Sequence, residues 1–272
     1  MPETARAAAA PRAITHRRVL RVALPIVVSN ATIPILGAVD TGVVGQLGEA
    51  APIGAVGIGA IILAGFYWVF GFLRMGTSGL VAQAQGAGDM AEVAAHLSRA
   101  LMIATGAGLA LIALQGPLVA AAFLIAPASP EVEALARDYL TIRIWGAPAA
   151  IAVYALTGWL IATERTAGVL ALQLWMNGAN AALDLWFVLG LGWGVGGVAV
   201  ATLIAEWSGA ALGLWLCRPA FRHPDWRSAA RVFSPRRDAA HGRGEWRHPA
   251  AVGAAAGLLH RLHVPGGGGS GM

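Results

Sequence analysis

The sequence contains six apolar stretches that are each long enough to cross a lipid bilayer, and this feature limits the possible folds more than any other. A helix needs roughly 20 apolar residues to span the hydrocarbon core. Charged residues make up only 12% of the chain, about half of their share in an ordinary soluble domain. We therefore expect an all-α polytopic membrane protein, a bundle of six transmembrane helices near residues 19–43, 53–73, 94–125, 132–162, 168–190 and 194–217.

The positions of the arginines predict how these helices are oriented. Most arginines lie in residues 1–18 and 218–272, whereas residues 19–217 hold six arginines against ten acidic residues. The connections between helices alternate in charge, and those with arginine include Arg74 and Arg165. Because cytoplasmic segments carry the basic residues, we expect a multi-pass protein of the inner (plasma) membrane with both termini in the cytoplasm. A basic excess confined to the ends does not favour nucleic acid as a partner.

The composition divides the chain into three parts. Residues 1–18 form a basic cytoplasmic N-terminus, and residues 19–217 form the six-helix transmembrane lobe. Residues 218–272 are rich in arginine, histidine and glycine and contain no apolar run of membrane length, so we expect a tail that is disordered or produced by a frameshift. The first apolar run continues to Val39 and five more follow, which favours a membrane span over a cleaved signal peptide.

Polar side chains on the fifth and sixth spans are the first candidates for function. Asn180 and Asp184 lie one helical turn apart, and Thr202 and Glu206 repeat this spacing. A carboxylate at membrane depth is costly unless it is paired, protonated or bound to a cation. These side chains therefore indicate a site for a proton or for a small cation with oxygen ligands. The alternative is a polar contact between helices, which fits Asn177 best.

Asp40 is a third candidate, near the end of the first span. An ionisable group in a membrane helix is a functional candidate by default, although Asp40 could simply mark the helix end, since Gly42 and Gly45 follow. Pro25 and Pro34 lie on the same span, where each removes a backbone hydrogen bond and allows a bend. A bend and a titratable group on one helix are the components of a conformational switch.

Two motifs resemble those of enzymes, but neither predicts catalysis. The GTSG sequence at Gly76–Gly79 matches intramembrane serine proteases, which need a histidine base on another membrane helix. Between residues 17 and 222 the chain offers His96 alone. No strand precedes the glycine-rich Gly86–Asp89, so a phosphate loop is not expected. We predict no enzymatic activity, no catalytic residue, no metal centre of cysteine and no organic cofactor.

Several segments together resemble one family of transporters. They are VALPIVVSN, VDTGVVGQLG, MGTSGLVAQAQGAGD, YLTIRIWGAPAAIAVYALTGWLIATERT and NGANAALDLWFVLGLGWGVGGVAVATLIAEW. Their order and spacing over residues 14–217 resemble the multidrug and toxic compound extrusion (MATE) transporters, in particular the DinF-like branch. The resemblance implies two six-helix lobes around a central cavity, and efflux of organic, often cationic, molecules in exchange for H⁺ or Na⁺. It covers the N-terminal lobe only.

The resemblance also assigns roles to particular positions. Asp40 corresponds to a first-helix aspartate whose protonation is linked to bending, and Pro25 to the proline of that bend. A coupling ion, H⁺ or Na⁺, would be held by a polar network on the same lobe, and Na⁺ would bind at Asp184, Asn180 and Thr202. Tyr139 joins this network in the same comparison.

Other functions remain open from the sequence. After RVFSPRR the chain no longer resembles the family, and alternating access in this architecture needs two lobes. The chain is therefore expected either to work with a second lobe supplied by another chain, or to be a non-transporting lobe fragment in the lipid bilayer. The alternative within the same superfamily is a lipid-linked oligosaccharide flippase. Such cavities are lined with more basic residues, whereas Arg143 is the only basic residue deep inside a predicted span here.

Overall fold

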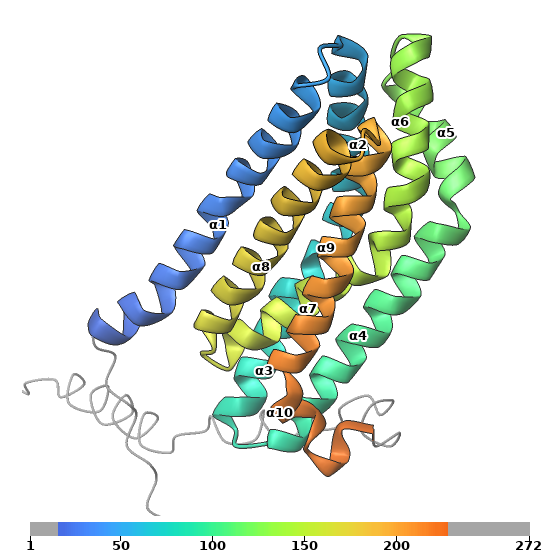
Figure 1. The fold of residues 1–272 in the computed structure, drawn as a ribbon. Coiled ribbons are helices and arrows are strands. Elements are labelled where there is room, and N and C mark those ends of the chain that lie inside the picture. The colour runs from blue at the N-terminus through green and yellow to red at the C-terminus, as the bar shows by residue number, and fades with distance from the viewer. Residues whose placement is uncertain (1–15, 228–272) are drawn as a thin grey trace, which may run out of the picture. The chain divides into compact units, whose positions relative to one another are not determined.

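The computed structural model describes residues 16–227, which form a bundle of helices with no strand among them (Figure 1). The helices follow one another as six legs joined by short connections. These legs are α1 (His16–Gly45); α2 (Ala50–Trp68), η1 (Val69–Gly71) and α3 (Phe72–Gly86); α4 (Met90–Ala113) and α5 (Gln115–Ile125); α6 (Pro130–Arg143), η2 (Ile144–Gly146) and α7 (Ala147–Ala162); α8 (Thr166–Asp184) and the π-helical η3 (Leu185–Gly190); and α9 (Gly194–Leu216).

The predicted all-α polytopic membrane fold is confirmed, and each predicted span falls on one leg. Four stretches of the described residues are long and apolar enough to cross a membrane, namely 50–86, 90–113, 130–162 and 194–216. The first and fifth predicted spans are helical too, as α1 and α8. In α8 the polar side chains that drew attention in the sequence lower the hydropathy of the helix.

The legs run alternately up and down, so the two ends of the described residues lie at the same end of the bundle (Figure 1). An even number of membrane crossings has this geometric consequence. It agrees with the prediction that both termini lie on one side of the membrane. That this side is the cytoplasm stays a prediction from the arginines.

Two legs contain a 3-10 turn partway along their length. Span 2 tightens to a 3-10 turn at η1, and span 4 does so at η2, directly before Ala147 and Pro148. Proline lacks the backbone N–H that would continue the ladder, which explains the break at η2. Helix α1 instead continues as an α-helix through Pro25. The bend expected at Pro25 is therefore not a break in this conformation, and its role stays a prediction.

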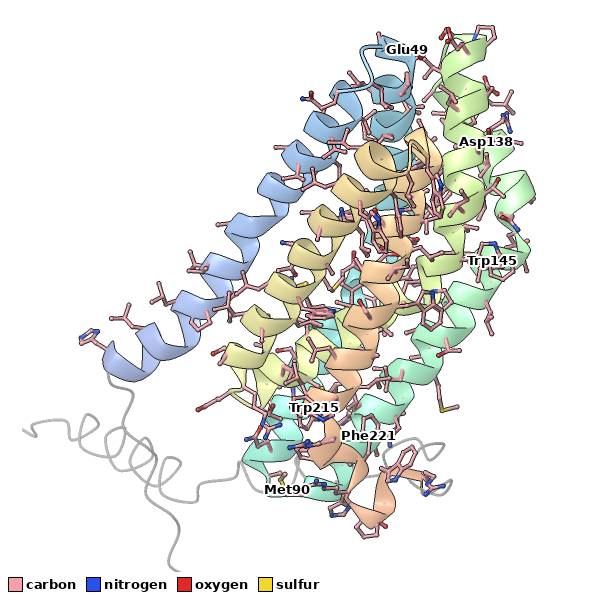
Figure 2. The ribbon with its side chains drawn as sticks, in the orientation of Figure 1. Glu49, Met90, Asp138, Trp145, Trp215 and Phe221 are labelled. Atoms are coloured by element: carbon pink, nitrogen blue, oxygen red, sulfur yellow. The ribbon has the colours of Figure 1, made fainter. Side chains whose placement is uncertain are left out.

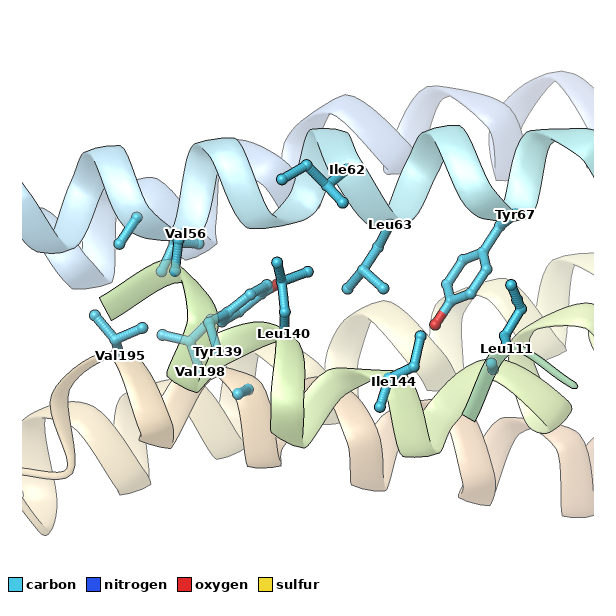
Figure 3. Packing of buried hydrophobic residues seen from close by; sticks show 14 of the residues in the cluster. Val56, Ile62, Leu63, Tyr67, Leu111, Tyr139, Leu140, Ile144, Val195 and Val198 are labelled. Carbon is cyan, nitrogen blue, oxygen red and sulfur yellow. The ribbon is translucent and has the colours of Figure 1, made fainter. Parts of the chain in front are cut away.

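The surface of the bundle is largely apolar, and a few polar groups are buried within an otherwise apolar interior. Trp145 and Trp215, for example, are more than half exposed and lie on the outside of the bundle (Figure 2). Inside, Leu63 and Tyr67 of α2 face Ile144 of η2 (Figure 3). In water such an outer surface would be unstable, whereas lipid tails solvate it. The packing therefore suits a bilayer.

A close helix contact sets the position of Tyr139 on α6. A Cβ atom at Gly59 of α2 would lie 3.0 Å from Cε1 of Tyr139 and closer still to Cδ1. No larger residue than glycine fits there without moving the ring. Gly59 thus lets α2 approach α6 and directs the tyrosine toward the space between α1, α8 and α9.

The ordered lobe continues through Arg227 and does not end at Cys217, where the sequence suggested that the tail begins. Helix α10 (Arg218–Phe221) and η4 (Pro224–Arg227) follow α9. The Ser98 hydroxyl of α4 donates a hydrogen bond to the Trp226 carbonyl at 2.8 Å. The Trp226 ring also meets that of Phe221 edge to face, with 5.4 Å between centroids. This aromatic anchor holds the segment on α4. The remaining tail (228–272) and residues 1–15 lie outside the described residues.

Candidate functional site

A cavity of about 290 Å³ lies among α1, α2, α6, α8 and α9. It contains most of the polar side chains that the sequence singled out. Its lining side chains come from helices far apart in the sequence, so the site forms only when the bundle is assembled. The lining residues are Gly37, Asp40, Ala60, Leu63, Ala64, Tyr67, Tyr139, Arg143, Gln173, Met176, Asn177, Asn180, Thr202, Ala205 and Glu206.

Asn180 is the centre of a polar contact between α1 and α8. Its side-chain amide donates to Oδ1 of Asp40 at 2.9 Å and to Oδ2 of Asp184 at 2.5 Å. Asn180 is 1% exposed and Asp184 is 0% exposed. The stripe on α8 thus turns inward, and the first-span aspartate meets it.

Two oxygen atoms of this group remain without a hydrogen-bond partner among the described residues. They are Oδ1 of Asn180 and Oδ1 of Asp184, both fully buried. Buried polar atoms almost always have a partner in proteins, so these oxygens indicate a place for a proton or a cation. The Asp40 and Asp184 carboxyls also lie close enough to interact with each other. Two ionised carboxylates at such a site would repel, and a proton on one of them would remove this repulsion.

Thr202 and Tyr139 complete the predicted set around the cavity. The Thr202 hydroxyl donates to the Val198 carbonyl at 2.9 Å, which leaves its oxygen lone pairs available. Tyr139 is buried, and its hydroxyl accepts a hydrogen bond from Nε of Arg143 at 3.4 Å. The structure therefore brings the five predicted residues together. Asp184 is not among the lining residues and joins the group through its hydrogen bond to Asn180. Pro25 does not line the cavity.

The sequence analysis missed an ion pair on the same cavity. Arg143 donates from both terminal nitrogens to the two carboxylate oxygens of Glu206, at 2.7 and 2.9 Å. Both side chains are buried. The signal was present in the sequence, because charges inside membrane spans tend to pair with one another. Arg143 was noticed only as the basic residue deep inside a span, and Glu206 only through its spacing from Thr202.

The charges of the cavity are unequal. Three carboxyl groups, those of Asp40, Asp184 and Glu206, belong to this polar group, and Arg143 is the one basic residue among the described lining residues. Buried charges of one sign repel strongly in a low-dielectric interior. Added positive charge would therefore stabilise the site. The described residues contain no cluster of histidine, cysteine and acidic side chains suited to a transition metal.

A bundle of apolar helices that encloses such an acidic, partly unsatisfied cavity is a polytopic membrane protein with a polar cavity among its helices. Comparison with known proteins identifies its family. The MatE family model matches residues 25–186, more than half of the chain. The chain therefore belongs to the MatE family, the multidrug and toxic compound extrusion proteins.

Two curated relatives illustrate the match. The chain is 39% identical over 197 residues to the DNA damage-inducible protein F of Escherichia coli K12, which covers 72% of this chain and 43% of the relative. It is 34% identical over 209 residues to a probable multidrug resistance protein NorM of Deinococcus radiodurans, covering 73% of this chain and 44% of the relative. The chain thus spans less than half the length of these relatives.

Solved structures show the same fold. A MATE structure in the bent conformation superposes with a TM-score of 0.72 at 22% identity, covering 82% of this chain and 49% of that one. An outward-facing multidrug resistance MATE transporter gives a TM-score of 0.71 at 23% identity, with the same coverage. At this level of identity the likeness concerns the fold alone, and it again corresponds to about half of each transporter.

Proposed function

We propose that this chain is the cation-coupling lobe of an efflux antiporter. In this proposal H⁺ or Na⁺ binds at the cavity and drives the expulsion of organic, often cationic, molecules across the plasma membrane. Asp40, Asn180 and Asp184 hold the coupling ion, with Thr202 and Tyr139 beside it. The proposal extends family membership to an activity of this chain.

The observation that carries the proposal is the pair of unsatisfied oxygens beside two neighbouring carboxyl groups. Oδ1 of Asn180 and Oδ1 of Asp184 have no donor among the described residues. A proton on Asp184 would satisfy one of them, and an Na⁺ ion coordinated by both would satisfy the two together. Either occupant compensates negative charge, so its arrival and departure change the electrostatics of the α1–α8 contact.

Exchange of this ion can change the helix packing, because Asp40 belongs to α1 and Asp184 to α8. With a proton between them the two carboxyls attract each other. Without it they are like charges in a low-dielectric interior and repel. A ligand shifts a conformational equilibrium through exactly such a difference in contacts. Pro25, on the same helix as Asp40, weakens the α1 backbone at a point where the helix can bend.

Transport requires a second lobe, which we propose is supplied by another chain or a further segment. Alternating access in this architecture is a rocking of two halves. Since this chain spans less than half of its relatives, the partner lobe would complete the substrate path. We place the assembly in the inner membrane with the termini of this lobe in the cytoplasm, from the arginine distribution. The single cavity-lining arginine does not favour an oligosaccharide flippase.

The test is transport by a two-lobe version, in which this chain is joined to the second lobe of the E. coli relative. We expect Asp40→Asn and Asp184→Asn each to abolish ion-driven export of ethidium from proteoliposomes while membrane insertion is unchanged. Pro25→Ala should slow export more than it weakens ethidium binding. Asp138→Asn is the matched control, because Asp138 is an exposed aspartate on the outer side of α6 (Figure 2).

Retention of full export by both cavity variants would refute the proposal. The polar group would then be a contact that holds α1 on α8 and nothing more. Equal loss in the Asp138→Asn control would show instead that the assay responds to surface charge.

A further inference from the structure

The Arg143–Glu206 ion pair occupies an unusual position for a structural salt bridge. It links the last residue of α6 to α9, directly before the 3-10 turn of η2, and both side chains line the cavity. Removing two charges from water often costs more free energy than their mutual attraction returns. A pair placed at a cavity wall also differs from one sealed in a core, because either partner can turn toward the cavity contents.

Other anionic groups lie on or beside the cavity that Arg143 lines. Its guanidinium interacts electrostatically with both Asp40 and Asp184. Its Nε already contacts the hydroxyl of Tyr139, and Tyr139 in turn interacts with Asp40. An arginine side chain is long and always charged. Arg143 therefore lines the same cavity as Glu206, Tyr139 and Asp40.

The charge balance of the cavity changes when the coupling cation leaves. With one proton shared by Asp40 and Asp184, the three carboxyls and Arg143 leave one net negative charge. After that proton departs, the net charge is −2. The two aspartates then attract Arg143 more strongly than Glu206 does. If Arg143 turns toward them, Glu206 loses its partner. A monovalent organic cation at Glu206 then restores the original balance.

We propose that Arg143 is a tethered counter-cation that exchanges between Glu206 and the aspartate pair, and that Glu206 binds the positive group of an organic cation while Arg143 is turned away. The inference rests on the proposed function and adds its substrate-binding carboxylate. In this scheme the coupling ion and the organic cation compete through the Arg143 side chain, so that only one of them is bound at a time.

The surroundings of Glu206 suit an organic ammonium group. Tyr67 and Tyr139 line the same cavity and offer aromatic faces, on which cations bind. The Tyr67 hydroxyl is buried and has no hydrogen-bond partner among the described residues, so it can accept or donate to a ligand. The ion pair itself packs against Gly146, where only glycine fits, because a Cβ atom there would lie 3.3 Å from Nη1 of Arg143 and even closer to Glu206.

The titratable groups that can affect this exchange come from every neighbouring helix. Those that interact electrostatically with Arg143 or Glu206 are Asp40, Tyr67, Tyr139, Tyr154 and Asp184. The tyrosines stay neutral across the physiological pH range. The aspartates are therefore the groups whose protonation changes the balance.

The experiment measures tetraethylammonium binding to the purified full chain by calorimetry, at acid and alkaline pH and with or without Na⁺. The unaltered chain should bind more tightly when the coupling cation is absent. Glu206→Gln should weaken binding by about tenfold or more, the factor of one charge-assisted contact. Arg143→Gln should strengthen binding at acid pH and remove its dependence on pH and Na⁺. Arg137→Gln, in the partly exposed pair with Glu133 on the same helix, should change neither the affinity nor its dependence on pH and Na⁺.

A purely structural ion pair gives a different pattern. Arg143→Gln would then weaken binding as much as Glu206→Gln does, and the double variant would recover it, which overturns the proposal. If the single variants do not fold, Arg143→Lys keeps the charge but loses the two-pronged contact with Glu206. Under the exchange model Arg143→Lys binds tetraethylammonium more tightly than the unaltered chain, and weaker binding refutes the model.

The same titrations separate this inference from the proposed function. If Asp184→Asn removes the dependence on the coupling cation while Arg143→Gln keeps it, the exchange is wrong and the coupling site stands. If Asp40→Asn and Asp184→Asn both keep the dependence, the coupling site itself is wrong. The exchange then fails with it.

Discussion

Replacing Asn180 by leucine should separate α1 from α8 without disturbing α8 itself. The amide of Asn180 bonds to Asp40 on one helix and to Asp184 on the other. Each hydrogen bond to a charged group contributes about 1.5–3 kcal/mol to stability. Loss of the bond costs more when its partner stays buried and unpaired. Leucine has nearly the same shape as asparagine, so its packing restores part of the lost stability. We expect the free energy of unfolding to fall by at least about 2 kcal/mol.

The assay is unfolding in mixed micelles by added sodium dodecyl sulfate, followed through the fluorescence of the ten tryptophans. Gln173→Leu is the matched control on the same helix and the same cavity. The Gln173 amide donates to Asn177 one turn along α8 at 3.1 Å, and such a pair contributes only about 0.2–0.5 kcal/mol.

Equal unfolding curves for the two variants would refute the reasoning. The bonds of Asn180 would then be replaced at no cost, by water in the cavity or by movement of Asp40. A loss of helix content in Asn180→Leu would also contradict it, since the amide is argued to join helices and not to form one.

Two further predictions concern the chain as a whole. Reporter fusions after residues 48, 128 and 192 should lie outside the cytoplasm, and fusions after 86, 165 and 225 inside, because the arginines occupy alternate connections; an external fusion at 225 would reverse the topology. Truncation after residue 237 should leave membrane yield unchanged, whereas truncation after Cys217 should lower it, because it removes the Phe221–Trp226 anchor on α4. Equal yields would show that this anchor contributes nothing.

The helices could be predicted because their signal is local. Membrane-length apolar runs determine the element type without knowledge of neighbours, and each predicted span lies on one leg of the bundle. The short packed segment after Cys217 escaped this reasoning, since its anchor is two aromatic residues and not a long apolar run. The breaks at η1 and η2 escaped it too, because a change from α to 3-10 leaves the apolar pattern of a buried leg almost unaltered.

The site could be predicted only in its components. Spacing on one helix brought Asn180 and Asp184 together and also singled out Thr202. Its position in a membrane span singled out Asp40, and the family resemblance added Tyr139. Contacts between helices have no periodicity to reveal them. The Asp40–Asn180 bond joins residues 140 positions apart, and the Arg143–Glu206 pair joins residues 63 apart. Both depend on how whole helices pack, which the sequence of either helix alone does not encode.

The π-helical turn at Leu185–Gly190 means that α8 carries one residue more than an α-helix needs, directly after Asp184. The N–H of Leu191 bonds to the carbonyl of Trp186, five residues back, and such turns correspond to a single inserted residue. Deleting one residue from this turn would restore the α-helical ladder and leave Asp184 and everything before it in register. The loop that leads into α9 would rotate instead. An insertion or deletion before Asp184 would rotate the polar stripe, whereas one after Asp184 would not. We therefore expect insertions and deletions in this helix to lie after Asp184.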